Sequence, residues 1–301
     1  IQMINNFSET IEKVKPFIKE ITNKTAIKAV DDMARSFTSS LFESDINFED
    51  FILSYKKDEI FNPDCLFDDQ SNLFDFIHSN YKSLSKVLFS SRPIGLGTPN
   101  AMVGEGEFMC LLLSPRVGIS KKKDSGDITV DDRPIEMKGE QVRIFGNITG
   151  VELQNHAKSI AETFNVEPNP VVKDRKAFEP WGTSPTKLQH WKEQFKHIGK
   201  DNALDFLATL FQKPKEIFTE CFEDDNYDAK ILNKVILKML FRDMTKKWEA
   251  FTMIDSDGRI TTITTNLDEF DSKVDSDKIY VTGDYFRSFQ NNNIGLYCEH
   301  I

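Results

Sequence analysis

The chain has 301 residues, 39% of them hydrophobic, and a formal net charge of −10. It is long enough to bury a sizeable core in one large domain or two smaller ones. The negative charge argues against a protein that coats nucleic acid non-specifically, because phosphate binding depends on Lys and Arg. The sequence contains neither an apolar run of about 18 residues nor a signal-peptide pattern, so we expect no membrane contact and a cytoplasmic location in a bacterial or phage-infected cell.

Residues 1–92 are predicted to form a helical N-terminal lobe. Apolar residues recur every three or four positions, as on one face of a helix, at 11–21, 26–41, 48–55 and 73–88. A stretch rich in Gly and Pro follows the last of these segments. The change in composition places the first boundary at residues 92–93.

Residues 93–168 are predicted to form the core. An apolar run at 108–113 indicates a helix, and two strand-like runs at 127–130 and 134–137 are joined by Asp131-Asp132-Arg133 in the manner of a hairpin. Helical spacing resumes at 153–164.

Residues 169–301 are predicted to form an α+β region that completes or extends this core. Several prolines around residues 168–185 mark the boundary. The region combines helices with a hairpin, because helical spacing at 188–211 and 231–251 is followed by strand patterns on both sides of an Asp257-Gly258 turn. Strands are also expected at 278–282 and 295–298. The sequence therefore predicts an α/β protein.

Three short stretches carry the residues that could perform chemistry. They are Gly104-Glu105-Gly106-Glu107, Ser125-Gly126-Asp127-Ile128 and Ile135-Glu136-Met137-Lys138-Gly139. Alternate side chains of a strand share a face, so Glu136 and Lys138 point the same way and Met137 points into the opposite layer. Antiparallel pairing of the two strands would place Asp127 beside them. Two carboxylates would then converge on one cation.

Together these stretches resemble the pattern of the PD-(D/E)XK nuclease superfamily: a helix carrying a Glu, an Asp at the start of a strand, and Glu-x-Lys on the next strand. The resemblance covers roughly residues 95–165. It implies a restriction-endonuclease-like central mixed sheet flanked by helices. The sequence departs from the family name at one point, because Gly126 stands where the name has Pro.

The resemblance implies a Mg²⁺-dependent deoxyribonuclease, restriction-like or phage-encoded, in which Mn²⁺ is expected to substitute. Asp127 and Glu136 would bind the metal, which prefers hard oxygen ligands and activates water. Lys138 would orient that water or stabilise the charge that develops on the phosphorane. Such enzymes commonly act as dimers, so a homodimer is expected. Whether the substrate is DNA or RNA stays open, with DNA preferred.

The helix glutamate would contribute through a water ligand or a second metal. Glu105 and Glu107 lie two positions apart and cannot share one helical face. We prefer Glu107, because it lies four residues before Leu111 and so on the same side as part of the apolar run.

Four basic residues are candidates for contacts with nucleic acid. Lys121, Lys122 and Lys123 come shortly before Asp127 and could bind the phosphates that flank the cut, although a solvated loop is an equal alternative. Arg143 is the fourth candidate, with a structural role as its alternative.

Two other interpretations fit the same residues. A non-catalytic structural or nucleic-acid-binding subunit of a virion or nucleoprotein assembly could keep the nuclease fold, and the acidic charge favours it. The complete set of Asp127, Glu136 and Lys138 argues against it. An exposed hairpin with a chance motif would predict neither metal binding nor cleavage. The four cysteines are spaced singly, which indicates reduced thiols and no zinc cluster.

Overall fold

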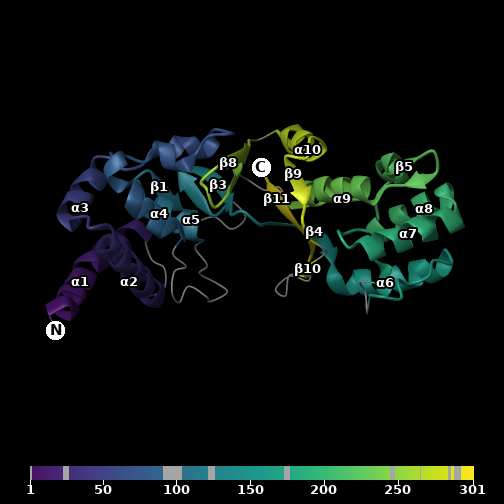
Figure 1. Ribbon diagram of the computed structural model, residues 1–301, viewed down its shortest axis with the longest axis horizontal. Helices are drawn as coiled ribbons and strands as arrows, with labels where there is room; N and C mark the ends of the chain where they lie inside the picture. The colour runs from purple at the N-terminus through teal and green to yellow at the C-terminus, as the bar shows by residue number, and fades with distance from the viewer. Residues whose placement is uncertain are drawn as a thin grey trace. The chain divides into compact units, whose positions relative to one another are not determined.

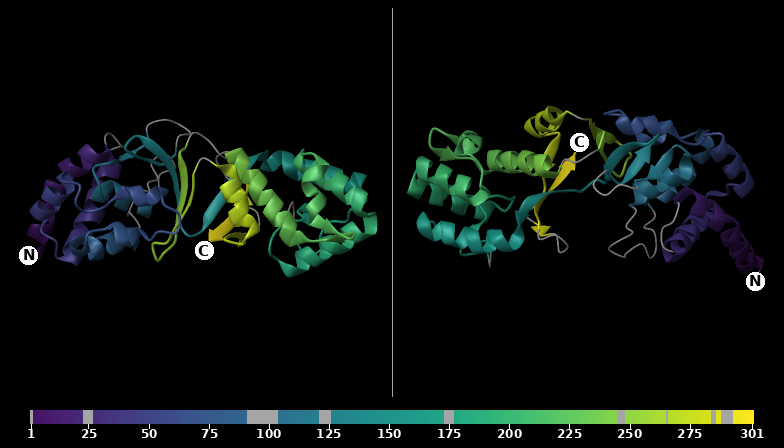
Figure 2. Two further views of the ribbon diagram at one scale, coloured as in Figure 1. Left: turned by 90° about the horizontal axis from the view of Figure 1, so that it is seen from above. Right: turned by 180° about the vertical axis from the view of Figure 1, so that it is seen from behind.

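The computed structural model of the chain describes residues 2–22, 27–90, 104–120, 126–172, 177–244, 248–264, 266–283, 286–287 and 293–301. The chain divides into two compact units (Figures 1 and 2). Unit 1 comprises Ile1–Glu140 and Lys246–Asn266, and unit 2 comprises Gln141–Thr245 and Leu267–Ile301. The N-terminal helices and the 128–138 hairpin therefore share one unit, and the chain crosses between the units after residues 140, 245 and 266.

Unit 1 contains most of the predicted N-terminal helices. Its helices are α1 (Gln2–Thr22), α2 (Ile27–Ser44), α3 (Phe48–Lys56), α4 (Lys82–Ser90) and α5 (Glu105–Leu113), with short 3-10 helices η1 (Pro63–Phe67), η2 (Leu73–Phe76) and η3 (Ser79–Tyr81). The single helix predicted for residues 73–88 is wrong in its first half. There, the side chains of Asn72 and His78 accept backbone hydrogen bonds and start two separate 3-10 turns. Such local side-chain bonds compete with a continuous helix.

The sheet of unit 1 is mixed. Its strands are β1 (Val117–Ile119), β2 (Ile128–Val130), β3 (Arg133–Lys138), β7 (Ala250–Ile254) and β8 (Ile260–Ile263), in the order β1-β2-β3-β7-β8. Neighbouring strands are antiparallel, except that β3 and β7 are parallel. The predicted class, a mixed sheet flanked by helices, is confirmed at this level.

Both predicted hairpins are present. Asp131 and Asp132 have φ angles of 48° and 64°, and two successive left-handed residues form the tight turn that suits the twist of β2 and β3. The turn between β7 and β8 places Gly258 at φ 83°. The Asp255 side chain accepts hydrogen bonds from the backbone N–H groups of Asp257 and Arg259 there, so this segment is the expected β-turn.

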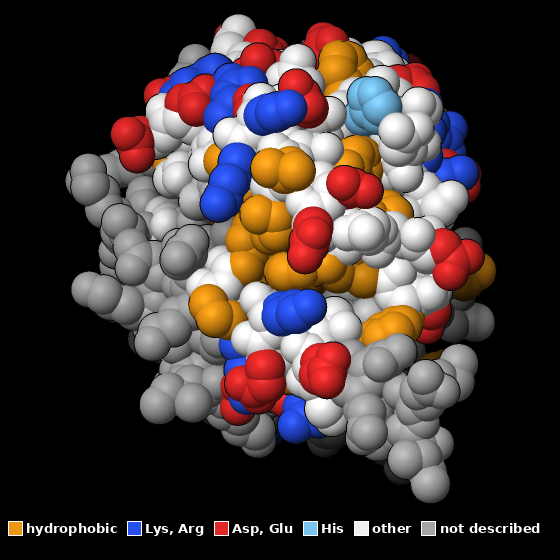
Figure 3. Space-filling view, turned by 90° about the vertical axis from the view of Figure 1, so that its left-hand side faces the viewer, with side chains coloured by type: hydrophobic (Ala, Val, Ile, Leu, Met, Phe, Trp, Pro, Cys, Tyr) orange, Lys and Arg blue, Asp and Glu red, His pale blue; other side chains and the backbone are white. Residues whose placement is uncertain are grey.

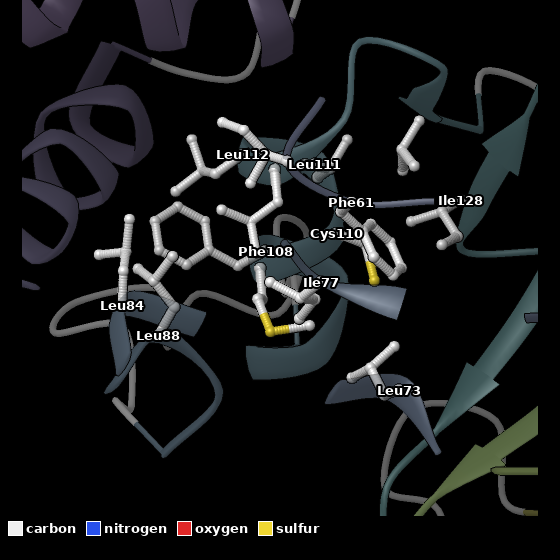
Figure 4. Packing of buried hydrophobic residues seen from close by; sticks show 14 of the residues in the cluster. Phe61, Leu73, Ile77, Leu84, Leu88, Phe108, Cys110, Leu111, Leu112 and Ile128 are labelled. Atoms are coloured by element: carbon white, nitrogen blue, oxygen red, sulfur yellow. The ribbon is translucent and has the colours of Figure 1, made fainter. Parts of the chain in front are cut away.

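Helix α5 lies at the centre of the core of unit 1. Every residue from Phe108 to Leu113 is fully buried, as expected of a helix that is apolar on all sides. Figure 4 shows its side chains meeting Leu84 and Leu88 of α4, with Ile128 of β2 nearby. Because the core surrounds this helix, it fixes the position of the glutamate in its first turn.

Unit 2 has its own sheet and helices. The helices are α6 (Gly150–Thr163), α7 (Pro185–Ile198), α8 (Lys200–Phe211), η5 (Lys215–Cys221), α9 (Ala229–Met244) and α10 (Leu267–Asp275), and the strands are β4 (Val142–Thr149), β5 (Phe222–Glu223), β6 (Asn226–Tyr227), β9 (Ile279–Val281), β10 (Phe286–Arg287) and β11 (Asn293–His300). Strand β11 pairs with β4, β9 and β10, and α9 packs on β4. The helix predicted for 188–211 is two helices, because Gly199 at φ 84° separates them.

Among the helices that the structure describes, none is long and apolar enough to cross a bilayer. Figure 3 shows the end of unit 1 near α1, α2 and α3, where hydrophobic side chains gather among charges of both signs. Phe42 of α2 and Leu53 of α3 are exposed. All four cysteines are free and buried.

Candidate active site

Asp127, Glu136 and Lys138 meet where β2 and β3 pair. The Nζ atom of Lys138 lies 3.1 Å from Oδ2 of Asp127 and also forms an ion pair with Glu136. The same Asp127 oxygen accepts a hydrogen bond from the backbone N–H of Met137 at 3.0 Å. Met137 is buried and its two neighbours are partly exposed, so the predicted alternation along β3 is confirmed. The two carboxylates are held together by one ammonium group.

Gly126 allows Asp127 to reach this position. Its φ angle is +93°, and the following N–H, that of Asp127, donates to the carbonyl oxygen of Ile135 at 2.8 Å. A Cβ atom at residue 126 would lie 2.5 Å from that oxygen. Proline cannot adopt a positive φ. The close approach of the two strands therefore explains why Gly126 stands before Asp127, where the name of the PD-(D/E)XK pattern has Pro.

Glu107 lies in the first turn of α5. Its Oε2 atom accepts a hydrogen bond from the backbone N–H of Gly104 at 3.1 Å. This turn contacts β3, since a Cβ atom at Gly106 would lie 3.0 Å from Cε of Met137. The turn therefore places Glu107 next to the strand that carries Glu136 and Lys138. The side chain of Glu105 lies outside the described part of the chain.

The charges of these groups act on one another. Burial and then the negative charge of Asp127 raise the pKa of Glu107 to about 7, against the lowering effects of the Gly104 N–H and of Lys138. Burial lowers the pKa of Lys138, but the carboxylates of Glu136 and Asp127 outweigh this and hold it above its ordinary value. Lys138 is therefore protonated at neutral pH, while Glu107 is shared between its two protonation states. The cluster carries more negative than positive charge, which favours a cation.

The donor set fits magnesium or manganese. Within the described ranges, no group of three or more His, Cys, Asp or Glu side chains is arranged to hold a metal ion. Mg²⁺ does not need such a group, because it is commonly held by one or two carboxylates and keeps several waters. Oδ1 of Asp127 accepts no hydrogen bond from the described residues, and this side chain is 31% exposed. Asp127 and Glu136 are the residues that would hold the ion.

The described structure leaves the four predicted basic contacts untested. Lys121, Lys122 and Lys123 lie outside the described residues. Arg143 is exposed on β4 of unit 2, where its guanidinium carbon lies 5.6 Å from the centre of the Tyr297 ring. A nucleic-acid contact by any of the four stays a prediction.

Two backbone groups that hold the cluster were missed by the sequence interpretation. They are the N–H groups of Gly104 and Met137. Gly104 and Glu107 have the spacing of a capping box, in which the side chain of the third helical residue accepts a hydrogen bond from the backbone N–H of the residue just before the helix. This spacing could have indicated the role of the Gly104 N–H. The sequence contains no comparable signal for the N–H of Met137.

Comparison with protein-family models, curated proteins and solved structures found no match for this chain. The inference about function therefore depends on the side chains around Asp127.

Proposed function

We propose that the protein is a divalent-metal-dependent endonuclease that hydrolyses phosphodiester bonds in DNA and has a restriction-endonuclease-like fold. The supporting observation is the contact of Lys138 with both Asp127 and Glu136, with Glu107 beside them. A cluster with three carboxylates and one ammonium group is costly for stability, and strongly shifted pKa values of this kind are typical of functional sites. The mixed sheet flanked by helices agrees with the fold that the resemblance to PD-(D/E)XK nucleases implies.

In this function each residue has a separate task. Asp127 and Glu136 would hold Mg²⁺ or Mn²⁺, which would act as a Lewis acid and help to activate the attacking water. The protonated Lys138 orients the attacking water or stabilises charge on the phosphorane. Glu107, with a pKa near neutrality, is suited to take up the proton that the water releases.

The test is incubation of the purified protein with supercoiled plasmid and Mg²⁺ or Mn²⁺. We expect nicked or linear product, and a rate at least about 100-fold lower for Asp127→Asn and for Lys138→Met, since each removes a group that acts on the transition state. Glu249→Gln is the matched control, because Glu249 is paired with Arg133 of the same sheet. This variant should cut at the parent rate. Cutting that continues undiminished in both site variants would contradict the assignment.

Metal binding gives a readout that does not depend on activity. Titration calorimetry should detect Mn²⁺ binding by the parent protein and weaker binding by Asp127→Asn. A chance motif on an exposed hairpin predicts neither binding nor cutting.

The second candidate is a non-catalytic nucleic-acid-binding or structural subunit, which the net charge of −10 favours. It predicts a parent protein that never cuts DNA with either metal. Sedimentation of the parent tests the predicted homodimer separately.

A further inference from the structure

Helix α4 carries two lysines and a phenylalanine along one side. Lys82, Lys86 and Phe89 are spaced four and three residues apart, so they lie in one row on the helix. Leu84 and Leu88, on the other side, are buried in the core. Lys86 is exposed, and Lys82 and Phe89 are partly exposed. The row is therefore accessible from outside the molecule.

This row leads to the candidate active site. The Nζ atom of Lys86 lies 5.7 Å from the centre of the Phe74 ring, whose edge-on partner is Phe89 at 5.6 Å between ring centres. Cε2 of Phe89 would be 3.4 Å from a Cβ atom at Gly106, the residue before Glu107. The aromatic pair thus connects the lysines to the first turn of α5.

The carboxylates that the structure describes do not neutralise the two lysines, although Lys86 contacts the Phe74 ring. Among the described residues, neither Lys82 nor Lys86 forms an ion pair. Other cations of unit 1 do form such pairs, for example Arg116 with Asp64 and Asp131, Arg133 with Glu249, and Arg259 with Asp255. A chain of net charge −10 needs a local cationic surface to attract a polyanion.

The length of the row suits a nucleic-acid strand. The seven helical steps from Lys82 to Phe89 span about 10 Å, which corresponds to about three nucleotides at a rise of about 3.4 Å. Lys82 and Lys86 are one helical turn apart and can contact neighbouring phosphates, while Phe89 stands closest to the catalytic groups. Phosphate contacts of this kind fix the register of the strand without reading its sequence.

We propose that α4 is part of the nucleic-acid-binding surface, with Lys82 and Lys86 contacting two phosphates of the strand whose cleavage point lies at Asp127, Glu136 and Lys138. The inference rests on the proposed nuclease function for the identity of its ligand.

The test measures binding of a fluorescein-labelled DNA duplex by anisotropy, with a chelator present so that no cutting occurs. Each phosphate contact contributes a slope of about −0.9 to the dependence of log K on log salt for duplex DNA. Lys82→Gln/Lys86→Gln should therefore reduce the slope by about 1.8 relative to the parent protein. With metal present, the same variant should raise KM and leave kcat close to that of the parent.

The matched control is Lys56→Gln/Lys57→Gln, which removes the same charge from unit 1. Both lysines are exposed at the end of α3, and the next residue, Asp58, accepts a hydrogen bond from Ser114 at the far end of α5. This control should keep the parent slope. An equal loss of slope in both double variants would overturn the inference, as would unchanged binding by Lys82→Gln/Lys86→Gln or a parent that does not bind.

Failure of the proposed function gives a different pattern. If the parent protein binds DNA with a salt dependence that requires Lys82 and Lys86 but never cuts it, the nuclease function is rejected and the α4 binding surface is kept. If the parent protein cuts DNA but Lys82→Gln/Lys86→Gln binds DNA as the parent does, the nuclease function is kept and the α4 binding surface is rejected.

Discussion

Replacing Gly126 by alanine should destabilise unit 1 by about 2–4 kcal/mol, because a strained positive φ costs on the order of 1–3 kcal/mol and a backbone clash adds to it. The added Cβ atom would lie 2.5 Å from the carbonyl oxygen of Ile135, and backbone cannot move aside as the end of a flexible side chain can. The hydrogen bond between Asp127 N–H and Ile135 would lengthen, and Asp127 would move away from Lys138. We therefore expect the variant to lose cleavage as well as stability.

Hydrogen exchange measured peptide by peptide is the suitable assay, because it can distinguish the two units. Amides of β2 and β3 should lose protection in Gly126→Ala, and those of β4 and β11 should not. Gly139→Ala is the control, since a Cβ atom there meets nothing within 4 Å. Equal protection of these amides in Gly126→Ala and in the parent would contradict the close contact between residue 126 and the carbonyl oxygen of Ile135.

Replacing Glu107 by glutamine should stabilise the protein and reduce its activity. The pKa of Glu107 is raised from 4.5 to about 7 in the folded state, so the neutral form favours folding. The stability that this contributes is fully present below pH 4.5 and is lost as the pH rises through 7. Glutamine stays neutral. Its advantage should grow from about 1 kcal/mol at pH 5.5 to about 3 kcal/mol at pH 8.

Urea denaturation at the two pH values measures this advantage. Glu59→Gln, at an exposed position of unit 1, should stay within about 0.5 kcal/mol of the parent at both. Cutting by Glu107→Gln should fall by about 100-fold or more, because glutamine cannot take up the proton that the attacking water releases. Excess Mg²⁺ should reduce the stability advantage at pH 8, because a bound cation offsets the charge of Glu107. If the stability difference between the variant and the parent did not change with pH, Glu107 would be neither buried nor close to the other carboxylates.

The part of the site that the sequence predicted is the part that depends on local rules. Glu136 and Lys138 share a face because a strand alternates with period two, and Asp127 meets them because two consecutive aspartates can adopt the left-handed turn at 131–132. The preference for Glu107 followed from its four-residue spacing to Leu111. The pKa of Glu107 could not be predicted, because it depends on burial and on charges from another element.

The part of the fold that could not be predicted depends on pairing between strands that lie far apart in the sequence. The pattern at 251–254 indicated a strand, but the helix predicted for 231–251 was too long, because α9 ends at Met244 and β7 begins at Ala250. All five residues of β7 are buried, so the pattern does not indicate which strand pairs with it. In the structure, Glu136 is opposite Phe251 and Lys138 is opposite Met253. The sequence analysis also missed local hydrogen bonds that compete with a helix. The side chains of Asn72 and His78 accept backbone hydrogen bonds that break the helix predicted for 73–88, and the spacing of apolar residues does not reveal them.

The parallel pairing of β3 with β7 affects how the protein is made. During synthesis, the strand that carries Glu136 and Lys138 leaves the ribosome more than a hundred residues before its neighbour, because Gln141–Thr245 of unit 2 is translated in between. In that interval β3 has an open edge, and open edges invite pairing with other chains. A shortened version of the protein that ends after the Glu-x-Lys strand should aggregate for the same reason. Any minimal fragment that keeps the candidate active site must therefore include residues 246–266, joined to the first 140 residues by a linker that replaces unit 2.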